Sequence, residues 1–369
     1  MLKIFIQGSG ITAKAVREKI AQTFDQFQES NLEKADVVVI SPGTKPQDWP
    51  QTAKPIISEI EFAFRYFCKS PVIAITGTNG KSTVTAMIAH ALNVEPLGNI
   101  GKPFILANFY DPWHVVEVSS YQLESTRTFK PFISVVTNFG EDHLEWHGSY
   151  EHYHRSKTKI WANQDKSDYL VYNANDAILS GYVHAATHTN KIAYQEDAEF
   201  NENAMAAFKA LSLCGMAADD IRKAFSTYRA LPHRMEKVNH SWGNVEIIND
   251  SKATNPESTC FALKQMKAST LLILGGRDKN TSLLEMKNMI PKKVRLTYLF
   301  GEAAERFQNE LNGIPMQRFE TLEQVLAAAK KEIKPGEVLL FSPACASFDQ
   351  FQNFEDRGRR FVGWVNDSE

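Results

Sequence analysis

Ile75-Thr76-Gly77-Thr78-Asn79-Gly80-Lys81-Ser82-Thr83 follows a short apolar run and begins a helical pattern that reaches Leu92. A glycine-rich turn in this context is typical of a phosphate-binding loop, because its backbone N–H groups and the helix N-terminus point at phosphate oxygens. Lys81 would balance phosphate charge, and the Ser82 hydroxyl would bind Mg²⁺. The loop departs from the general pattern at Ile75, where a glycine is usual, and a helix-capping turn beside a surface lysine is the competing interpretation. We predict that a nucleotide binds Gly77, Thr78, Asn79, Gly80, Lys81, Ser82 and Thr83.

Short apolar runs alternate with helical patterns along most of the chain. The runs are continuous rather than alternating in polarity, as expected of strands buried on both faces of a parallel sheet. The predicted strands are 37–40, 72–75, 115–118, 133–136, 271–274 and 338–341. The predicted helices are 82–92, 149–161, 202–214, 256–266 and 322–333. This order indicates an α/β fold with crossover connections.

Chain length indicates several domains, because 369 residues exceed the size of one ordinary domain. Two breaks in the pattern, at Phe67–Pro71 and at Ala230-Leu231-Pro232-His233, separate series of strands. We therefore predict domains at residues 1–70, 71–230 and 231–369.

Composition excludes several classes of protein. Hydrophobic residues make up 43% of the chain, charged residues 23%, and the net charge is −2, which gives no reason to expect a nucleic-acid partner. No apolar run approaches the ~18 residues of a membrane-spanning helix, and the apolar part of the N-terminus is too short for a signal peptide. The four cysteines are widely spaced, which fits a reducing compartment. We expect a cytoplasmic protein without a membrane partner.

Further motifs, in the same order along the chain, resemble the Mur ligase family, which shares this loop variant with folylpolyglutamate synthases. They are Gly98-Asn99-Ile100-Gly101, Glu117–Glu124, Asn138–Leu144, Leu231–Glu236 and Asn249–Asn255. The most discriminating is Ser342-Pro343-Ala344-Cys345-Ala346-Ser347-Phe348-Asp349-Gln350-Phe351, continuing to Phe354 and Arg357-Gly358. This last segment is similar to the D-glutamate-adding member of the family.

The resemblance implies a fold and a reaction. The fold would comprise a Rossmann-like N-terminal domain that binds a UDP-linked substrate, a P-loop central domain with a parallel sheet, and a Rossmann-like C-terminal domain that binds the amino acid. The reaction would add D-glutamate to UDP-N-acetylmuramoyl-L-alanine through an acyl phosphate, with ATP and two Mg²⁺ ions. We expect a monomer, and closure of the third domain over the second.

The chemistry requires cations, because the attacking carboxylate and the triphosphate are both anions. Glu117, at the C-terminal end of a strand, is placed to hold Mg²⁺ beside Ser82, although an exposed strand end is the alternative. The resemblance makes His143 a second magnesium ligand, whereas its own chemistry also fits a helix cap or a general base.

The resemblance also implies that CO₂ carbamylates Lys157 and converts it into a magnesium ligand. Without the resemblance to the family, Lys157 would be interpreted as a surface lysine on an amphipathic helix. The alignment of the motif selects Lys157 and not Lys159 as the modified residue. The implied metal ligands are Ser82, Glu117, His143 and Lys157, and the implied catalytic residues are Lys81, Asn99, Glu117, His143 and Lys157.

Other positions resemble the family's substrate contacts. Those on the nucleotide side are Asn203, His233, Arg234 and Asp250, and those on the muramoyl side are Asn99 and Gln122. Those of the amino-acid pocket are Lys252, Thr254, Lys279, Ser347 and Phe354, and those at the UDP end are Ile11, Thr12 and Gly43. A helix N-cap at Ser347, core packing of Phe354 and a plain turn at Gly43 are equally open.

The chain departs from the family in three places. Glu199-Phe200 stands where a His-Asn pair is usual, Ile178–Tyr194 is short, and residues 13–35 lack the usual acidic turn that contacts uridine. Two alternatives therefore stand beside the main interpretation. One is a family member that adds another amino acid or dipeptide, or glutamylates folate. The other is a non-catalytic nucleotide-binding protein. The presence of all the implied metal ligands argues against this alternative.

Overall fold

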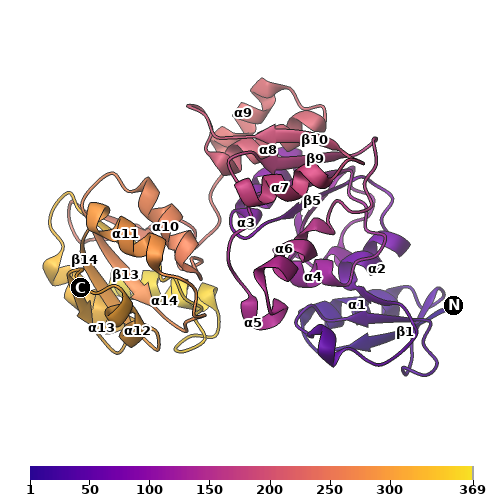
Figure 1. The fold of residues 1–369 in the computed structure, drawn as a ribbon, viewed down its shortest axis with the longest axis horizontal. Coiled ribbons are helices and arrows are strands. Elements are labelled where there is room, and N and C mark those ends of the chain that lie inside the picture. Colours follow the sequence, from indigo (N-terminus) through magenta and orange to yellow (C-terminus); the bar gives the residue numbers. More distant parts are fainter. Residues whose placement is uncertain (368–369) are drawn as a thin grey trace. The chain divides into compact units, whose positions relative to one another are not determined.

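The chain folds into α/β layers built on three separate sheets (Figure 1). The structure, a computed structural model, describes residues 1–367. Two compact units are present, Met1–Tyr228 and the chain from Arg229 onward. The first unit contains two of the sheets and the second contains the third. The predicted α/β class with parallel sheets is confirmed.

The first sheet has the strand order β2-β1-β3-β4, and all its strands are parallel. Its strands are β1 Leu2–Gln7, β2 Phe27–Glu29, β3 Val37–Ile40 and β4 Ile56–Ser58. Its helices are α1 Ile11–Gln22, the short 3₁₀ helix η1 Pro46–Asp48 and α2 Glu59–Tyr66. All four residues of β3 are buried, which explains why its sequence is apolar throughout.

Two buried carboxylates of α2 tie this sheet to the next one. The Glu61 carboxylate accepts backbone N–H groups of Arg127, Thr128 and Phe129 at 2.8–3.0 Å. Burial opposes ionisation of Glu61, but these hydrogen bonds and the Thr128 hydroxyl lower its pKa below its usual range. Burial raises the pKa of Glu59 to about 7. One apolar core continues across both sheets, so a division into domains near residue 70 stays a prediction.

The second sheet has the order β10-β9-β8-β5-β7-β6 and is parallel throughout. Its strands are β5 Val72–Thr76, β6 Pro96–Gly98, β7 His114–Glu117, β8 Ile133–Val136, β9 Tyr169–Asn173 and β10 Asn190–Tyr194. Its helices are α3 Lys81–Leu92, η2 Phe104–Leu106, α4 Ser120–Glu124, α5 Leu144–His147, α6 Tyr150–Thr158, α7 Ala177–Ala185, α8 Glu202–Leu213 and α9 Ala218–Thr227. Strand β5 lies between β7 and β8, so the loop after β5 lies where ligands bind in open α/β sheets.

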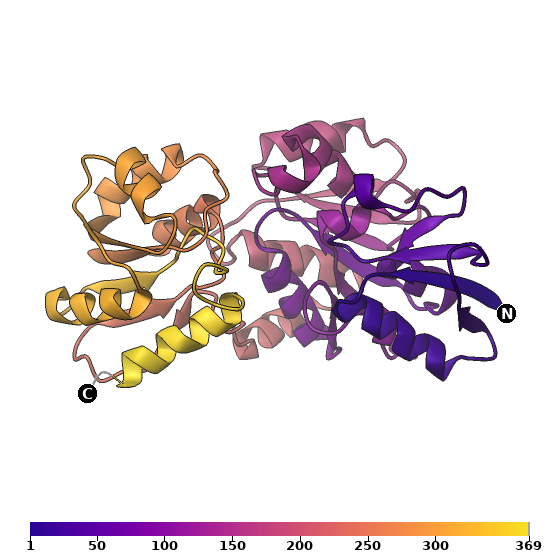
Figure 2. The ribbon, with the colours of Figure 1, turned by 90° about the horizontal axis from the view of Figure 1, so that it is seen from below.

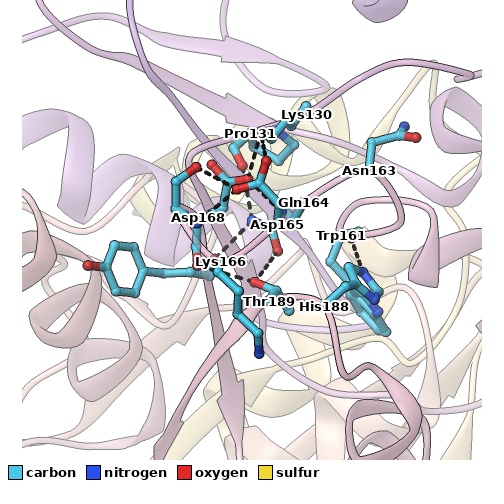
Figure 3. Close-up of polar contacts among 12 residues, drawn as sticks. Lys130, Pro131, Trp161, Asn163, Gln164, Asp165, Lys166, Asp168, His188 and Thr189 are labelled. Atoms are coloured by element: carbon cyan, nitrogen blue, oxygen red, sulfur yellow. Dashed lines mark hydrogen bonds and ion pairs between the residues drawn. The ribbon is translucent and has the colours of Figure 1, made fainter.

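A cluster of polar contacts anchors the segment that follows α6 (Figure 3). The buried Gln164 amide donates to the Pro131 carbonyl at 3.0 Å and accepts the Thr189 hydroxyl at 3.1 Å. Lys130 Nζ lies 2.6 Å from Asp165 Oδ2, and this hydrogen bond holds the pKa of Asp165 well below its usual range. The C-terminal end of α6 is thereby connected to the loop before β8 and to the start of β10.

The third sheet has the order β11-β12-β16-β13-β14-β15, in which only β11 is antiparallel to its neighbour. Its strands are β11 Glu236–Lys237, β12 Glu246–Asn249, β13 Thr270–Gly275, β14 Val294–Phe300, β15 Met316–Arg318 and β16 Val338–Phe341. Its helices are α10 Pro256–Gln265, α11 Leu284–Lys293, α12 Ala304–Glu310, α13 Leu322–Glu332 and α14 Phe354–Asp367. Helices α10 and α11 pack on one core and α13 and α14 on another, which places the two pairs on opposite faces (Figures 1 and 2).

All six predicted strands and all five predicted helices are present in the structure. The largest difference is the end of α6 at Thr158 instead of Trp161. The chain tightens there into turns, with Ile160 N–H donating to the Lys157 carbonyl at 3.2 Å. Within residues 1–367, every helix is too short or too polar to cross a lipid bilayer.

Candidate active site

The phosphate-binding loop requires glycine at two positions. Gly77 has φ +144°, and a Cβ there would lie 1.9 Å from Thr137 Oγ1. Gly80 has φ +82°, and a Cβ there would lie 2.3 Å from Asn203 Oδ1. Both positive φ angles disfavour residues with a side chain, and the neighbouring atoms leave no room for one. Asn203, in the first turn of α8, therefore lies against the loop, as expected of a nucleotide-side residue.

Asn138 holds the loop in place. Its Oδ1 accepts the backbone N–H groups of Thr78 at 3.2 Å and Asn79 at 2.8 Å, and its Nδ2 donates to the Asn79 carbonyl at 3.2 Å. The Thr137 hydroxyl donates to the same carbonyl at 2.5 Å. Asn138 belongs to one of the family motifs, but the motif alone indicates no role for it. Its position just after β8, the strand beside β5, is the signal that points to this contact.

Lys81 and Ser82 begin helix α3 directly after the loop. Lys81 Nζ lies 2.8 Å from the carbonyl oxygens of both Gly77 and Thr78, so the ammonium stands over the loop backbone. The Ser82 side chain is buried in the first helical turn. A helix N-terminus with an ammonium beside it attracts anions, which is what a triphosphate requires.

Glu117 ends β7 opposite Ile75 of β5, two residues before Gly77. Its side chain is 1% exposed, so the interpretation as an exposed strand end is wrong. Oε1 accepts Asn99 Nδ2 at 2.7 Å, whereas Oε2 is buried and makes no hydrogen bond within the part of the chain that the structure describes. Burying a carboxylate oxygen without a hydrogen-bond donor lowers the stability of the fold unless a cation binds that oxygen. Carboxylate oxygen is the ligand that Mg²⁺ prefers, so Glu117 fits the predicted ion.

His143 occupies the N-cap position of α5 with a left-handed backbone, φ 56°. The prediction of a helix-cap residue is therefore correct for its position, but its side chain makes no capping hydrogen bond. Nδ1 lies 3.6 Å from carboxylate oxygens of both Asp142 and Glu145, and the ring packs against Tyr121 at 4.8 Å between centroids. The imidazole is therefore oriented by contacts to its ring.

Lys157 is 1% exposed, so the interpretation as a surface lysine is wrong. Its Nζ lies 2.9 Å from the centroid of the Tyr153 ring. The Tyr153 hydroxyl donates to Thr78 Oγ1 at 3.3 Å, and its ring centroid lies 5.9 Å from that of His143. Tyr153, for which the sequence indicated no role, thus brings together the phosphate-binding loop, His143 and Lys157. By contrast, Lys159 is paired with Glu124 at 2.8 Å.

Gln122 has a structural contact in addition to any contact with substrate. It is the third residue of α4 and forms a capping box with Ser119, whose backbone N–H and hydroxyl both donate to Gln122 Oε1 at 2.9 Å. Its amide oxygen therefore accepts the hydrogen bonds of the cap, which leaves its amide N–H groups as the possible donors to a substrate.

The predicted UDP-end residues lie at the carboxyl ends of two adjacent strands. Ile11 and Thr12 begin α1 after β1, and Gly43 follows β3, the strand that pairs with β1. Ser41 N–H donates to the Gln7 carbonyl at 3.1 Å, which joins the two turns. Ile11 is 78% exposed, so its side chain is accessible to a ligand.

In the second unit, the residues that are predicted to bind the amino-acid substrate also follow the ends of strands. Arg277 and Ala346 form an antiparallel bridge, which brings the loop that carries Lys279 beside the loop that carries Ser347. Lys252 Nζ lies 3.8 Å from the centroid of the Phe354 ring. Ser347 is buried, and the next helix, α14, begins only at Phe354, so Ser347 is not its N-cap.

A fully buried arginine organises these loops. Arg357 donates to the Ser251 hydroxyl at 3.0 Å, to the Ser251 carbonyl at 2.7 Å and to the Ala346 carbonyl at 3.3 Å. It thereby joins the segment that carries Lys252 and Thr254 to the loop that carries Ser347. Arg357 belongs to the discriminating motif, but nothing local in the sequence reveals these partners or the role that follows from them.

The nucleotide-side residues of the second unit form their own network. His233 Nδ1 contacts Asn249 Nδ2 at 2.9 Å, and the Lys252 N–H donates to the His233 carbonyl at 3.0 Å. Asp250 accepts the Ser342 hydroxyl at 2.8 Å, and burial raises its pKa to about 7. Arg234 lies in the same turn, half-buried. Contacts of these residues with a nucleotide stay predictions.

Two family models match this chain, one in each of its two compact units. The Mur ligase middle domain matches residues 75–212, and the Mur ligase glutamate ligase domain matches residues 233–345. The UDP-N-acetylmuramoylalanine–D-glutamate ligase of Acidobacterium capsulatum is 36% identical over 89% of this chain and 82% of its own length. The enzyme of that name from Aquifex aeolicus is 35% identical over 89% and 88%. The chain belongs to the Mur ligase family.

Solved structures support the fold of this Mur ligase. MurC from Thermotoga maritima matches with a TM-score of 0.64 over 100% of both chains, at 19% identity. MurF from Acinetobacter baumannii matches with a TM-score of 0.67 over 98% of this chain and 90% of its own, at 15% identity. MurF from Thermotoga maritima, solved in complex with ADP, matches with a TM-score of 0.65 over 98% and 93%, at 15% identity.

The residues that depart from the Mur ligase motif have contacts of their own. Glu199 forms an ion pair with Arg222, with 2.6 Å between Oε1 and Nε. The Phe200 ring packs against Phe208 and Phe225 at 5.3 and 5.6 Å between centroids. This pair therefore stabilises the packing of α8 and α9 in this Mur ligase.

We predict that Gly77→Ala weakens binding of ADP by about tenfold or more, because the new Cβ would displace Thr137 and the loop backbone. Titration calorimetry measures the affinity. The matched control is Gly215→Ala, which also has a positive φ, +85°, but has no neighbouring atom within 4 Å of the new Cβ. Equal ADP affinity in the two variants would show that this Mur ligase does not bind nucleotide through the loop.

Proposed function

We propose that this Mur ligase joins D-glutamate to UDP-N-acetylmuramoyl-L-alanine in the cytoplasm, with conversion of ATP to ADP and phosphate. The observation that carries the proposal is the similarity to relatives of that name, at 36% identity over 82% of the relative's length. The discriminating motif at residues 342–351 and the glutamate ligase domain over residues 233–345 support the same acceptor.

In the first step, a carboxylate oxygen of the muramoyl substrate attacks the γ-phosphorus, and the bond to the β–γ bridging oxygen breaks as ADP leaves. The loop N–H groups and Lys81 would hold the triphosphate and screen its charge. Mg²⁺, when bound, supplies further positive charge, and Ser82, Glu117, His143 and Lys157 would hold the two ions. The buried Oε2 of Glu117 supports this assignment.

Lys157 requires a chemical change before it serves as a ligand, because an ammonium repels a cation. Its neutral amine would attack the carbon of CO₂, form an N–C bond and lose a proton, which leaves a carbamate with one negative charge. Burial at 1% exposure favours the neutral amine that this reaction needs. The Tyr153 ring would hold the side chain in position.

In the second step, the amine of D-glutamate attacks the acyl carbon and a C–N bond forms; the C–O bond to the phosphate then breaks, phosphate leaves, and the nitrogen loses a proton to solvent. Asn99 and the amide N–H groups of Gln122 are the proposed donors to the acyl group. Lys279 and Ser347 are proposed to bind the two carboxylates of D-glutamate, since a compact cation and a hydroxyl donor suit that task. Lys252, Thr254 and Phe354 would complete the pocket.

The proposed function predicts a selective acceptor. With UDP-N-acetylmuramoyl-L-alanine, ATP and Mg²⁺, phosphate release should depend on D-glutamate and should stay at background with L-alanine, L-lysine or diaminopimelate. Turnover with one of those three instead would assign the chain to another reaction of the family. Nucleotide binding without turnover on any acceptor would favour a non-catalytic protein.

We also predict that Lys157→Ala abolishes ligation and that a small carboxylate such as acetate partly restores it, by replacing the lost carbamate. Lys159→Ala, on the same helical segment, should stay within about threefold of the parent rate because its ammonium pairs with Glu124. Phosphate release measures all three. Full activity of Lys157→Ala without acetate would remove the carbamate from the mechanism.

A further inference from the structure

We propose that Glu124, His147 and His152 form a binding site for one transition-metal ion of the zinc type, distinct from the magnesium ligands proposed above. One ligand atom from each side chain lies within 4.8 Å of the other two. The three residues come from three helices: Glu124 ends α4, His147 ends α5, and His152 lies in the first turn of α6.

Both imidazoles have their second nitrogen hydrogen-bonded, as is usual for metal-binding histidines. His152 Nδ1 lies 2.9 Å from the His147 carbonyl, which only accepts hydrogen bonds, so Nδ1–H donates there, and Nε2, which faces Glu124 Oε2, is the atom that must be unprotonated when the ion binds. His147 Nε2 lies 3.0 Å from Ser120 Oγ, a hydroxyl that can accept or donate a hydrogen bond. His147 Nδ1, on the side of Ser156, is then the second nitrogen ligand.

The separation of two of the ligand atoms suits a tetrahedral ion. His152 Nε2 and Glu124 Oε2 are 3.3 Å apart. Two ligand atoms at zinc bond lengths of about 2.0–2.1 Å are separated by about 3.3 Å in tetrahedral geometry. Two imidazoles with one carboxylate form a ligand set found in zinc sites that keep a fourth position open, whereas Mg²⁺ prefers oxygen ligands alone. The His152 side chain is 43% exposed, which gives the ion a path from solvent.

Charge both favours and opposes the ion. His147 is buried, and it would bind the ion as the neutral imidazole, the form that binds metals. Lys159 Nζ donates to Glu124 Oε1 at 2.8 Å, and the Ser156 hydroxyl donates to Oε2, the oxygen that faces His152, so the ion would replace the Ser156 hydrogen bond. The same ammonium repels a cation, so Lys159 limits the affinity of the site.

Titration of the full chain with Co²⁺ and with Zn²⁺, in excess Mg²⁺, tests the proposal. The parent should bind one Co²⁺ with the visible absorption of a four-coordinate ion, and Zn²⁺ should displace it. His152→Ala and Glu124→Gln should each weaken binding by about tenfold or more. His184→Ala removes an exposed histidine of α7 and should leave the affinity unchanged.

Two further variants distinguish this site from the magnesium site and from nonspecific binding of the ion. Lys159→Gln should tighten Co²⁺ binding by about threefold or more, because it removes a positive charge and keeps a hydrogen-bond donor. Glu117→Gln should leave Co²⁺ affinity unchanged, since Glu117 belongs to the magnesium set. Circular dichroism of each metal-free variant checks that it is folded. The proposal is overturned if the parent binds no Co²⁺, or if binding is lost in Glu117→Gln and retained in His152→Ala.

Discussion

The central constraint in this protein is a buried carboxylate beside a phosphate-binding loop. Glu117 is 1% exposed, its Oε1 is held by Asn99, and its Oε2 makes no hydrogen bond among the described residues. Burying a charged oxygen without a partner costs roughly several kcal/mol of desolvation free energy, unless a cation offsets that cost. The fold places this oxygen at the carboxyl end of β7, in register with the strand that leads into the loop. This arrangement is what the proposed ion, bound together with a polyanion, would require.

The rest of the first unit holds the surroundings of that carboxylate rigid. Asn138 fixes the loop backbone from β8, and Tyr153 connects the loop to α6, to His143 and to Lys157. These contacts orient the predicted reactive groups before any ligand arrives, which is how an enzyme reduces the entropy cost of assembling a transition state. Arg357 has the equivalent role in the second unit, where one buried guanidinium joins two loops that carry predicted substrate residues.

Local patterns in the sequence predicted much of this structure. The phosphate-binding loop, the strand ending at Glu117 and the main helices follow from residue order, because apolar runs and glycine turns have local causes. Contacts between distant segments did not follow from it. Glu61 binds backbone groups more than 60 residues away and so joins two sheets that also share one apolar core. The burial of Lys157 could be inferred only from the family motif, since nothing around it in the sequence distinguishes it from Lys159.

The most direct test of the central role of Glu117 is the affinity of Mn²⁺ for the ADP complex, measured by electron paramagnetic resonance. Glu117→Gln should weaken Mn²⁺ binding by about tenfold or more, because it replaces a charged ligand with a neutral one of the same shape. Glu95→Gln, which changes a carboxylate that is 65% exposed, should leave the affinity unchanged. Equal Mn²⁺ affinity in the parent and in Glu117→Gln would contradict this account.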